Sequence, residues 1–225
     1  MSTITARATR FRPNRATLLW AALVLNVEAL AVVAFLFVSD ARIIDPLPTI
    51  VYPMVWIDVS LWAVATTTPA AGSTRRRRLA ATLAVGYFLV LAYVGGILNP
   101  GHALHGHAHA SGFRVQLLSL PPGWNPALYY GGSLVSVALI PFKTAGYLAL
   151  AYLVYATVLE AAGSALAGIA GLFSCVSCTW PIVGTVVTGL FGSAAGVVAL
   201  NHSYGLSTLV FLSAVALLYY RPSVG

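Results

Sequence analysis

The sequence predicts an all-α protein, a single membrane domain over residues 1–225 built as a bundle of about six transmembrane helices. Three observations lead to this class. Hydrophobic residues make up 59% of the chain and charged residues only 8%, whereas about a quarter of a soluble domain is charged. Mean hydropathy is +0.87. Long apolar runs recur along the chain, and most basic residues lie beside them.

Six apolar runs are expected to cross the bilayer, which requires about 20 residues per helix. The first run follows a basic tail at residues 1–16 and is too long for the apolar core of a secretory signal. The predicted spans are residues 17–38, 50–69, 79–98, 131–160, 165–188 and 206–220. A seventh span would arise if residues 175–181 formed a turn, and this would place Arg221 outside.

The fourth run is longer than one straight crossing requires, and it contains Pro141. Two alternatives fit this length. Either one tilted helix kinks at Pro141, or a short interfacial helix precedes a span that begins at about Phe142.

The basic residues predict the orientation. Lys and Arg number twelve against five acidic residues, and the net charge is +7. Nine of the basic residues would be cytoplasmic in the six-span arrangement, and they are Arg7, Arg10, Arg12, Arg15, Arg75, Arg76, Arg77, Arg78 and Arg221. The bias of basic residues toward the cytoplasm therefore predicts a multi-pass protein of the cell membrane with both termini cytoplasmic. Its partner is expected to be the lipid bilayer and not a nucleic acid.

A histidine-rich loop is expected outside the cell, at residues 99–128. It contains His102, His105, His107 and His109 in a Gly/Ala setting. Neutral imidazoles two and three residues apart can turn onto one copper, nickel or zinc ion. The alternative is a polar loop that is enriched in histidine by chance or chelates metals weakly.

The only two cysteines of the chain, Cys175 and Cys178, form a C-x-x-C motif within an apolar run. No charged residue occurs between Glu160 and Arg221, so the thiols are expected in or beside lipid. Positions i and i+3 share one helix face, which allows both sulfurs to hold a soft ion or to form a strained disulfide. In the alternative reading, each cysteine is a small buried apolar residue.

Three charged residues fall inside predicted spans, where a charge is costly and calls for a reason. Glu28, Asp58 and Lys143 are all expected within about two helical turns of the bilayer midplane. A carboxylate–ammonium pair is the simplest arrangement, and a purely structural pair that orients helices is the alternative. Cys175 and Cys178 are expected at a similar depth, which would place them on one pathway with these charges.

The last fifty residues resemble the cysteine-bearing hairpin of bacterial mercuric-ion transporters. The resemblance rests on Cys175, Cys178, Pro181, the glycines near Gly192, the step at Ala199 and Leu200 before Tyr204, and the ending Leu217 to Arg221. In that family two adjacent cysteines on an outward-running helix receive the ion, whereas two residues separate the cysteines here. The match covers less than a quarter of the chain. The remainder resembles small, uncharacterised Ala/Gly-rich membrane proteins of archaeal or high-GC type, a resemblance that implies no activity.

Taken together, these features predict a membrane protein that binds or transports a transition metal, with copper expected first. The sequence has no phosphate-binding loop, nucleophile elbow or H-E-x-x-H motif, so nothing in it argues for an ATPase or a hydrolase. A metal donor protein or other membrane subunits are the expected protein partners. One alternative is an accessory or assembly subunit of a membrane respiratory complex, because Gly192 and Gly196 form a G-x-x-x-G helix-contact spacing. The other is a thiol–disulfide carrier, whose partner thiols would lie on another protein.

Overall fold

The structure of the 225-residue chain is a computed structural model that describes residues 15–39, 43, 45–100, 112–160 and 203–219. The chain divides into two units, Met1–Ala41 and Arg42–Gly225, and each is described by itself. The described residues of the first unit form helix α2, over Arg15–Val38. Its 24 residues correspond to a length of about 36 Å, somewhat more than the hydrocarbon thickness of a bilayer.

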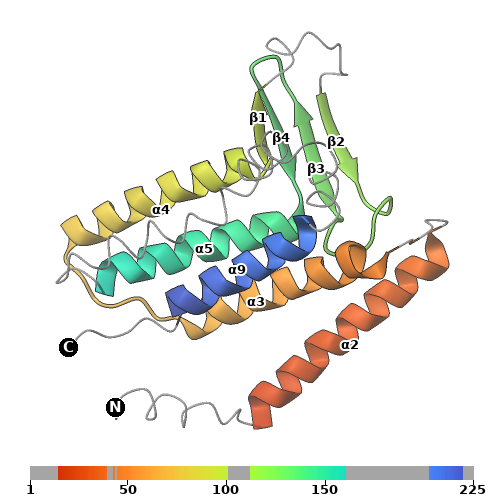
Figure 1. Ribbon diagram of the computed structural model, residues 1–225, viewed down its shortest axis with the longest axis horizontal. Helices are drawn as coiled ribbons and strands as arrows, with labels where there is room; N and C mark the ends of the chain where they lie inside the picture. The colour runs from red at the N-terminus through yellow and green to blue at the C-terminus, as the bar shows by residue number, and fades with distance from the viewer. Residues whose placement is uncertain (1–14, 40–42, 44, 101–111, 161–202, 220–225) are drawn as a thin grey trace, which may run out of the picture. The chain divides into compact units, whose positions relative to one another are not determined.

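In the described part of the second unit, the long helices α3, α4, α5 and α9 run alongside one another (Figure 1). A π-helical turn, η1 (Leu47–Val51), leads into α3 (Tyr52–Thr66), which is followed by α4 (Thr74–Val94). The other two helices are α5 (Pro141–Glu160) and α9 (Ser203–Tyr219). Helix α5 contacts α3, α4 and α9, and ten of its residues are buried. It is therefore the central helix of this unit.

Contacts between helix ends establish the helix directions. The Lys143 ammonium at the start of α5 reaches Gly95 at the end of α4, whereas a Cβ added to Gly72, before α4, would lie 3.3 Å from Leu159 near the end of α5. Helices α4 and α5 are therefore antiparallel. The rings of Trp62 and Tyr219 lie 4.5 Å apart near the ends of α3 and α9. Figure 1 shows both helices running in the same direction as α5.

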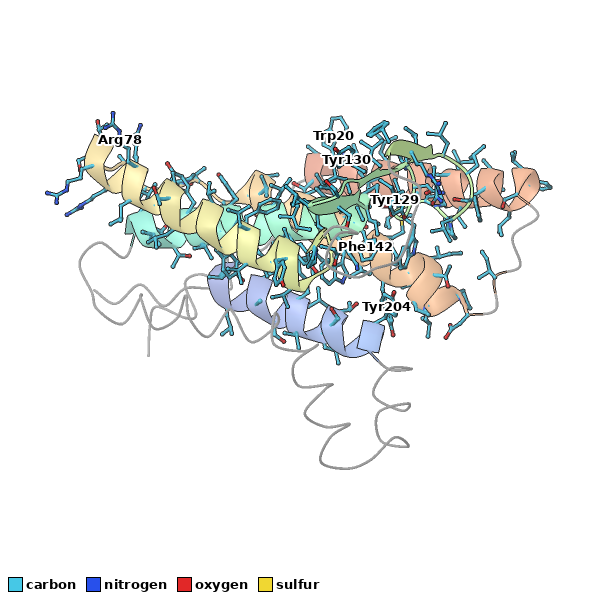
Figure 2. The ribbon with its side chains drawn as sticks, turned by 90° about the horizontal axis from the view of Figure 1, so that it is seen from above. Trp20, Arg78, Tyr129, Tyr130, Phe142 and Tyr204 are labelled. Carbon is cyan, nitrogen blue, oxygen red and sulfur yellow. The ribbon has the colours of Figure 1, made fainter. Side chains whose placement is uncertain are left out.

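These directions distinguish the two ends of the helices. One end, the arginine end, carries the run Arg75–Arg78 in the first turn of α4. The other, the sheet end, is where α4 ends and α3, α5 and α9 begin. Figure 2 shows Arg78 far from Phe142 and Tyr204, which lie in the first turns of α5 and α9.

Trp56 of α3 lies at the centre of the core. Its ring stacks on Phe211 of α9 with a centroid distance of 4.1 Å and an interplanar angle of 9°, and it meets the edge of Phe142 at 5.7 Å. Gly146 of α5 allows this approach, because a Cβ there would lie 2.8 Å from the Trp56 Cζ3 atom. A glycine one turn into α5 thus lets three helices pack around a single indole.

An antiparallel sheet is inserted between α4 and α5. Its strands are β1 (Leu98–Pro100), β2 (Gly112–Gln116), β3 (Ala127–Gly131) and β4 (Val135–Leu139), in the order β1-β4-β3-β2. The sheet corrects the all-α expectation, although the part of the chain that the structure describes is mainly helical. Strand β2 and all of β1 except Leu98 lie within residues 99–128, which were expected to form a polar loop. Strand β3 runs from the end of that loop to Gly131, and β4 lies near the start of the region 131–160, which was expected to be a long helix.

Directly opposed residues of antiparallel strands point to the same face, so the register separates two faces. One row consists of Phe113, Tyr130, Val137 and Leu98, which oppose one another across all four strands. Val115, Leu128 and Leu139 form the neighbouring row, and Val135 lies on the same side. We call these eight residues the apolar sheet face. The opposite face carries Arg114, Gln116, Tyr129, Ser136 and Asn99.

Among the described residues, four helices are long and apolar enough to cross a membrane: Arg15–Val38, Leu47–Thr66, Thr74–Val94 and Pro141–Glu160. The apolar helix over Ser207–Tyr219 is shorter. Helix α5 begins at Pro141, near the start expected in the two-segment alternative, but a strand precedes it instead of an interfacial helix. Proline is favourable at this first position because its missing N–H removes no helical hydrogen bond. The predicted span at 165–188 lies outside the described residues, so the count of six spans stays a prediction.

Candidate functional site

The predicted histidine ligands lie in a segment that is flanked by two described strands. His102, His105, His107 and His109 fall within residues 101–111, outside the described ranges. Before this segment, Pro100 of β1 opposes Val135, and after it Gly112 of β2 opposes Gly131. Residues 131–135 connect β3 to β4, so both ends of the histidine segment lie beside this turn. The turn lies at one end of the strands. At the opposite end, β4 leads directly into α5.

The predicted thiol ligands, Cys175 and Cys178, fall within residues 161–202, also outside the described ranges. The residues that flank this segment are described. Glu160 ends α5 at the arginine end, and Ser203 begins α9 at the sheet end. The segment with the C-x-x-C motif therefore connects opposite ends of the helices.

Lys143, one of the three charged residues predicted inside the spans, has a defined contact. It lies two residues after the start of α5, is half-buried, and its Nζ donates a hydrogen bond of 3.2 Å to the Gly95 carbonyl oxygen. Carbonyls at the end of a helix lack intrahelical partners and carry partial negative charge, so an ammonium group there is favourable. Lys143 thus caps the C-terminal end of α4.

Tyr147 packs against the same helix end, one turn after Lys143. A Cβ added to Gly95 would overlap the Tyr147 hydroxyl and lie 2.5 Å from its ring carbons Cζ and Cε2. The backbone N–H of Gly95 meanwhile bonds to the Leu91 carbonyl at 2.7 Å. Only glycine fits at this point. We call Gly95, Lys143 and Tyr147 the Gly95 junction. Sequence reasoning missed it, and the Gly-Gly pair after the apolar run is the feature that could have indicated it.

The three charged residues lie at different positions along their own helices. Glu28 is thirteen residues into α2, about 20 Å along the axis, whereas Lys143 is only about 3 Å into α5. The expectation of a common depth in the bilayer took the fourth span to begin at residue 131, whereas α5 begins at Pro141 after a strand. The common depth stays a prediction. Asp58 is half-buried in the middle of α3. A pair between Lys143 and either carboxylate stays a prediction.

An aromatic cluster joins the helices to the sheet. The Trp124 Nε1–H donates to the Thr49 carbonyl at 2.9 Å, and the Trp124 ring contacts Phe142 and Tyr204 at centroid distances of 4.8 and 5.9 Å. Sequence reasoning missed a second indole bond, from Trp56 Nε1 to Thr208 Oγ1 at 3.1 Å, because 152 positions separate the partners.

Within the described ranges, no three side chains of His, Cys, Asp or Glu gather where they could hold a metal ion. These ranges contain the Gly95 junction and the aromatic packing, and they flank the two segments that bear the predicted ligands.

Comparison with known proteins places the chain in a family. No curated protein and no solved structure matches it. One family model matches residues 1–225, the whole of the chain. The protein therefore belongs to the family of unknown function DUF7546.

Proposed function

We propose that this DUF7546 protein is a multi-pass protein of the cell membrane that binds a soft or borderline transition metal, copper in the first place, and passes it into or across the bilayer. The observation that carries the proposal is the polarity of the second unit. Strands β1 and β2 of the sheet flank the segment that contains the four histidines, whereas four consecutive arginines lie at the opposite end of the helices.

The orientation follows from this polarity. Arginines beside an apolar span favour the cytoplasmic side, so the sheet and the histidine segment would face outward. A histidine segment on the outer surface would meet metal ions before any other part of the chain. The segment containing Cys175 and Cys178 connects the sheet end to the arginine end, which suits a route between the two sides.

The two ligand sets have different roles in this proposal. The imidazoles of His102, His105, His107 and His109 collect the ion, and the thiolates of Cys175 and Cys178 hold it within the membrane. Thiolates select Cu(I), whereas imidazoles bind several divalent metals with less discrimination. Glu28 and Asp58 balance the charge of the ion. Lys143 has a separate role, since it closes α4 at the Gly95 junction.

Metal analysis of the detergent-purified protein tests the proposal. We expect the unmutated protein to hold tightly bound copper, and the double change of Cys175 and Cys178 to Ser to abolish this while weaker binding at the histidines persists. Ser174→Ala with Ser177→Ala changes the same segment without removing a thiol, and it should leave binding unchanged.

Replacement of His102, His105, His107 and His109 by Ala should slow metal loading of the thiol site without removing it. His202→Ala, outside the histidine segment, is the matched control and should load at the unmutated rate. A metal-free unmutated protein, or a metal content that neither set of changes alters, would reject metal binding.

The accessory-subunit function is the second candidate, and the exposed apolar sheet face is the observation that favours it. Phe113 and Tyr130 of this face are 65% and 51% exposed. An exposed apolar patch is typical of a surface that meets another protein. Absence of metal, together with stable co-purification with respiratory-complex subunits, would place this candidate first.

A further inference from the structure

The apolar sheet face leaves large side chains uncovered. Phe113 is 65% exposed, Tyr130 51%, Val115 and Val135 48%, and Leu139 37%. An aromatic side chain presents about 200 Å², so Phe113 and Tyr130 alone leave on the order of 200 Å² exposed. The aliphatic residues bring the patch to the few hundred Å² at which exposed apolar surface marks an interaction site.

We propose that the apolar sheet face is a dimer interface, on which a second copy of this chain packs its own apolar sheet face. A symmetric dimer presents the same patch from both subunits, so the patch must be complementary to itself. A charged patch would repel its copy. The eight residues of this face include no charged side chain, because Arg114, the charged residue of these strands, points to the opposite face.

The direction of the sheet allows such a dimer. Figure 1 shows the strands running across the helix direction and following one another outward, from β1 beside the end of α4 to β2. The faces of the sheet therefore point sideways from the helices. If the helices cross a membrane, as the proposed function requires, these faces look along the membrane plane. Two copies in one membrane are related by an axis along its normal, and rotation about that axis can bring two sideways faces together.

The proposed dimer would pack one sheet face to face on another, as in β-sandwiches. Two sheets that pack face to face lie about 10 Å apart, with side chains of both inner faces interdigitated. A stable interface buries about 800 Å² on each partner, so the apolar sheet face would form its core and polar surroundings its rim. Phe113 and Tyr130, directly opposed on β2 and β3, form the aromatic centre that such an interface requires.

The dimer can be tested with the full chain in lipid vesicles. Copies that carry donor and acceptor fluorescent proteins at the C-terminus are reconstituted together, and energy transfer is measured as the protein is diluted in lipid. We expect the unmutated protein to be dimeric. Phe113→Lys and Tyr130→Lys should each weaken the dimer by about 30-fold or more, as expected for the loss of an interface hot spot.

Two control variants on the other face of β2 distinguish loss of the dimer interface from loss of sheet stability. Gln116→Lys introduces the same charge at the neighbouring exposed position of that face, and Arg114→Ala removes one. Both variants should dimerise as the unmutated protein does. Equal loss in the variants of both faces would reject the proposal, because it would assign the effect to sheet stability.

Two further outcomes would overturn the proposal. An unmutated protein that stays monomeric at every dilution would leave a lipid surface or a different protein as the occupant of the face. A dimer that Phe113→Lys and Tyr130→Lys leave intact would use another surface. Resistance of the same vesicles to alkaline extraction reports membrane insertion separately. Failure to insert would therefore reject the membrane placement in the proposed function. Metal content is not measured in this experiment, so its result does not depend on metal binding.

Discussion

The Lys143 Nζ donates a hydrogen bond of 3.2 Å to the Gly95 carbonyl oxygen. Gly95 directly follows α4, before the sheet begins, and Lys143 lies in the first turn of α5, after the sheet ends. The bond therefore ties together the two points at which the chain leaves the helices to form the sheet and returns to them. This makes the Gly95 junction the base of the whole sheet insertion.

Gly95→Ala should destabilise the protein by about 1–3 kcal/mol, because its Cβ would overlap the Tyr147 ring in a packed site. Gly86→Ala, inside α4, is the control, since a Cβ at Gly86 meets nothing within 4 Å. That change should be neutral or stabilising by up to about 1 kcal/mol, as alanine is the better helix former. Denaturant unfolding in detergent micelles measures both. Equal effects of the two changes would show that Tyr147 does not restrict residue 95.

Lys143→Met should lower the free energy of unfolding by about 1–2 kcal/mol. Methionine retains an apolar stem but leaves the Gly95 carbonyl without its charged donor. Lys143→Arg keeps a cationic donor and should lose less. The same unfolding assay compares the two variants. A methionine variant as stable as the arginine variant would argue that the bond to Gly95 contributes nothing measurable.

Thr208→Val should destabilise the protein by about 1–3 kcal/mol, because it leaves the buried Trp56 N–H without an acceptor. Ser213→Ala is the control in α9. The Ser213 hydroxyl also donates to a carbonyl four residues earlier, but it is exposed, and its loss should cost less than about 0.5 kcal/mol. In a Trp56→Phe background, which has no indole N–H, Thr208→Val should lose most of its effect. Additive changes would contradict the coupling of Trp56 to Thr208.

Reporters of membrane topology should place residues 225 and 105 on opposite sides. A reporter fused after Gly225 is expected in the cytoplasm, and one inserted at His105 is expected outside. Replacement of Arg75–Arg78 by Gln should produce mixed orientations, whereas Arg114→Gln should not, because Arg114 lies on the sheet. An external C-terminus would reject the six-span arrangement with cytoplasmic termini.

The predicted metal ligands stay predictions, because the histidines and cysteines lie outside the described residues. Their types and spacing are local features that the sequence displays directly. The structure adds only where the flanking residues lie, and those positions come from pairings such as Pro100 with Val135 and Gly112 with Gly131. No spacing in the sequence carries that information.

The sequence by itself determined the apolar helices. Apolar composition over about 20 residues is a local property, and it located α2 and most of α3 and α4. Only the tertiary structure decided the sheet, the start of α5 and the partner of Lys143. Strands of three to five residues are too short for a clear periodic signal, and β1 pairs with β4 across 35 or more positions. Lys143 likewise owes its bond to the antiparallel packing of α4 and α5, which brings residues 48 positions apart to one helix end.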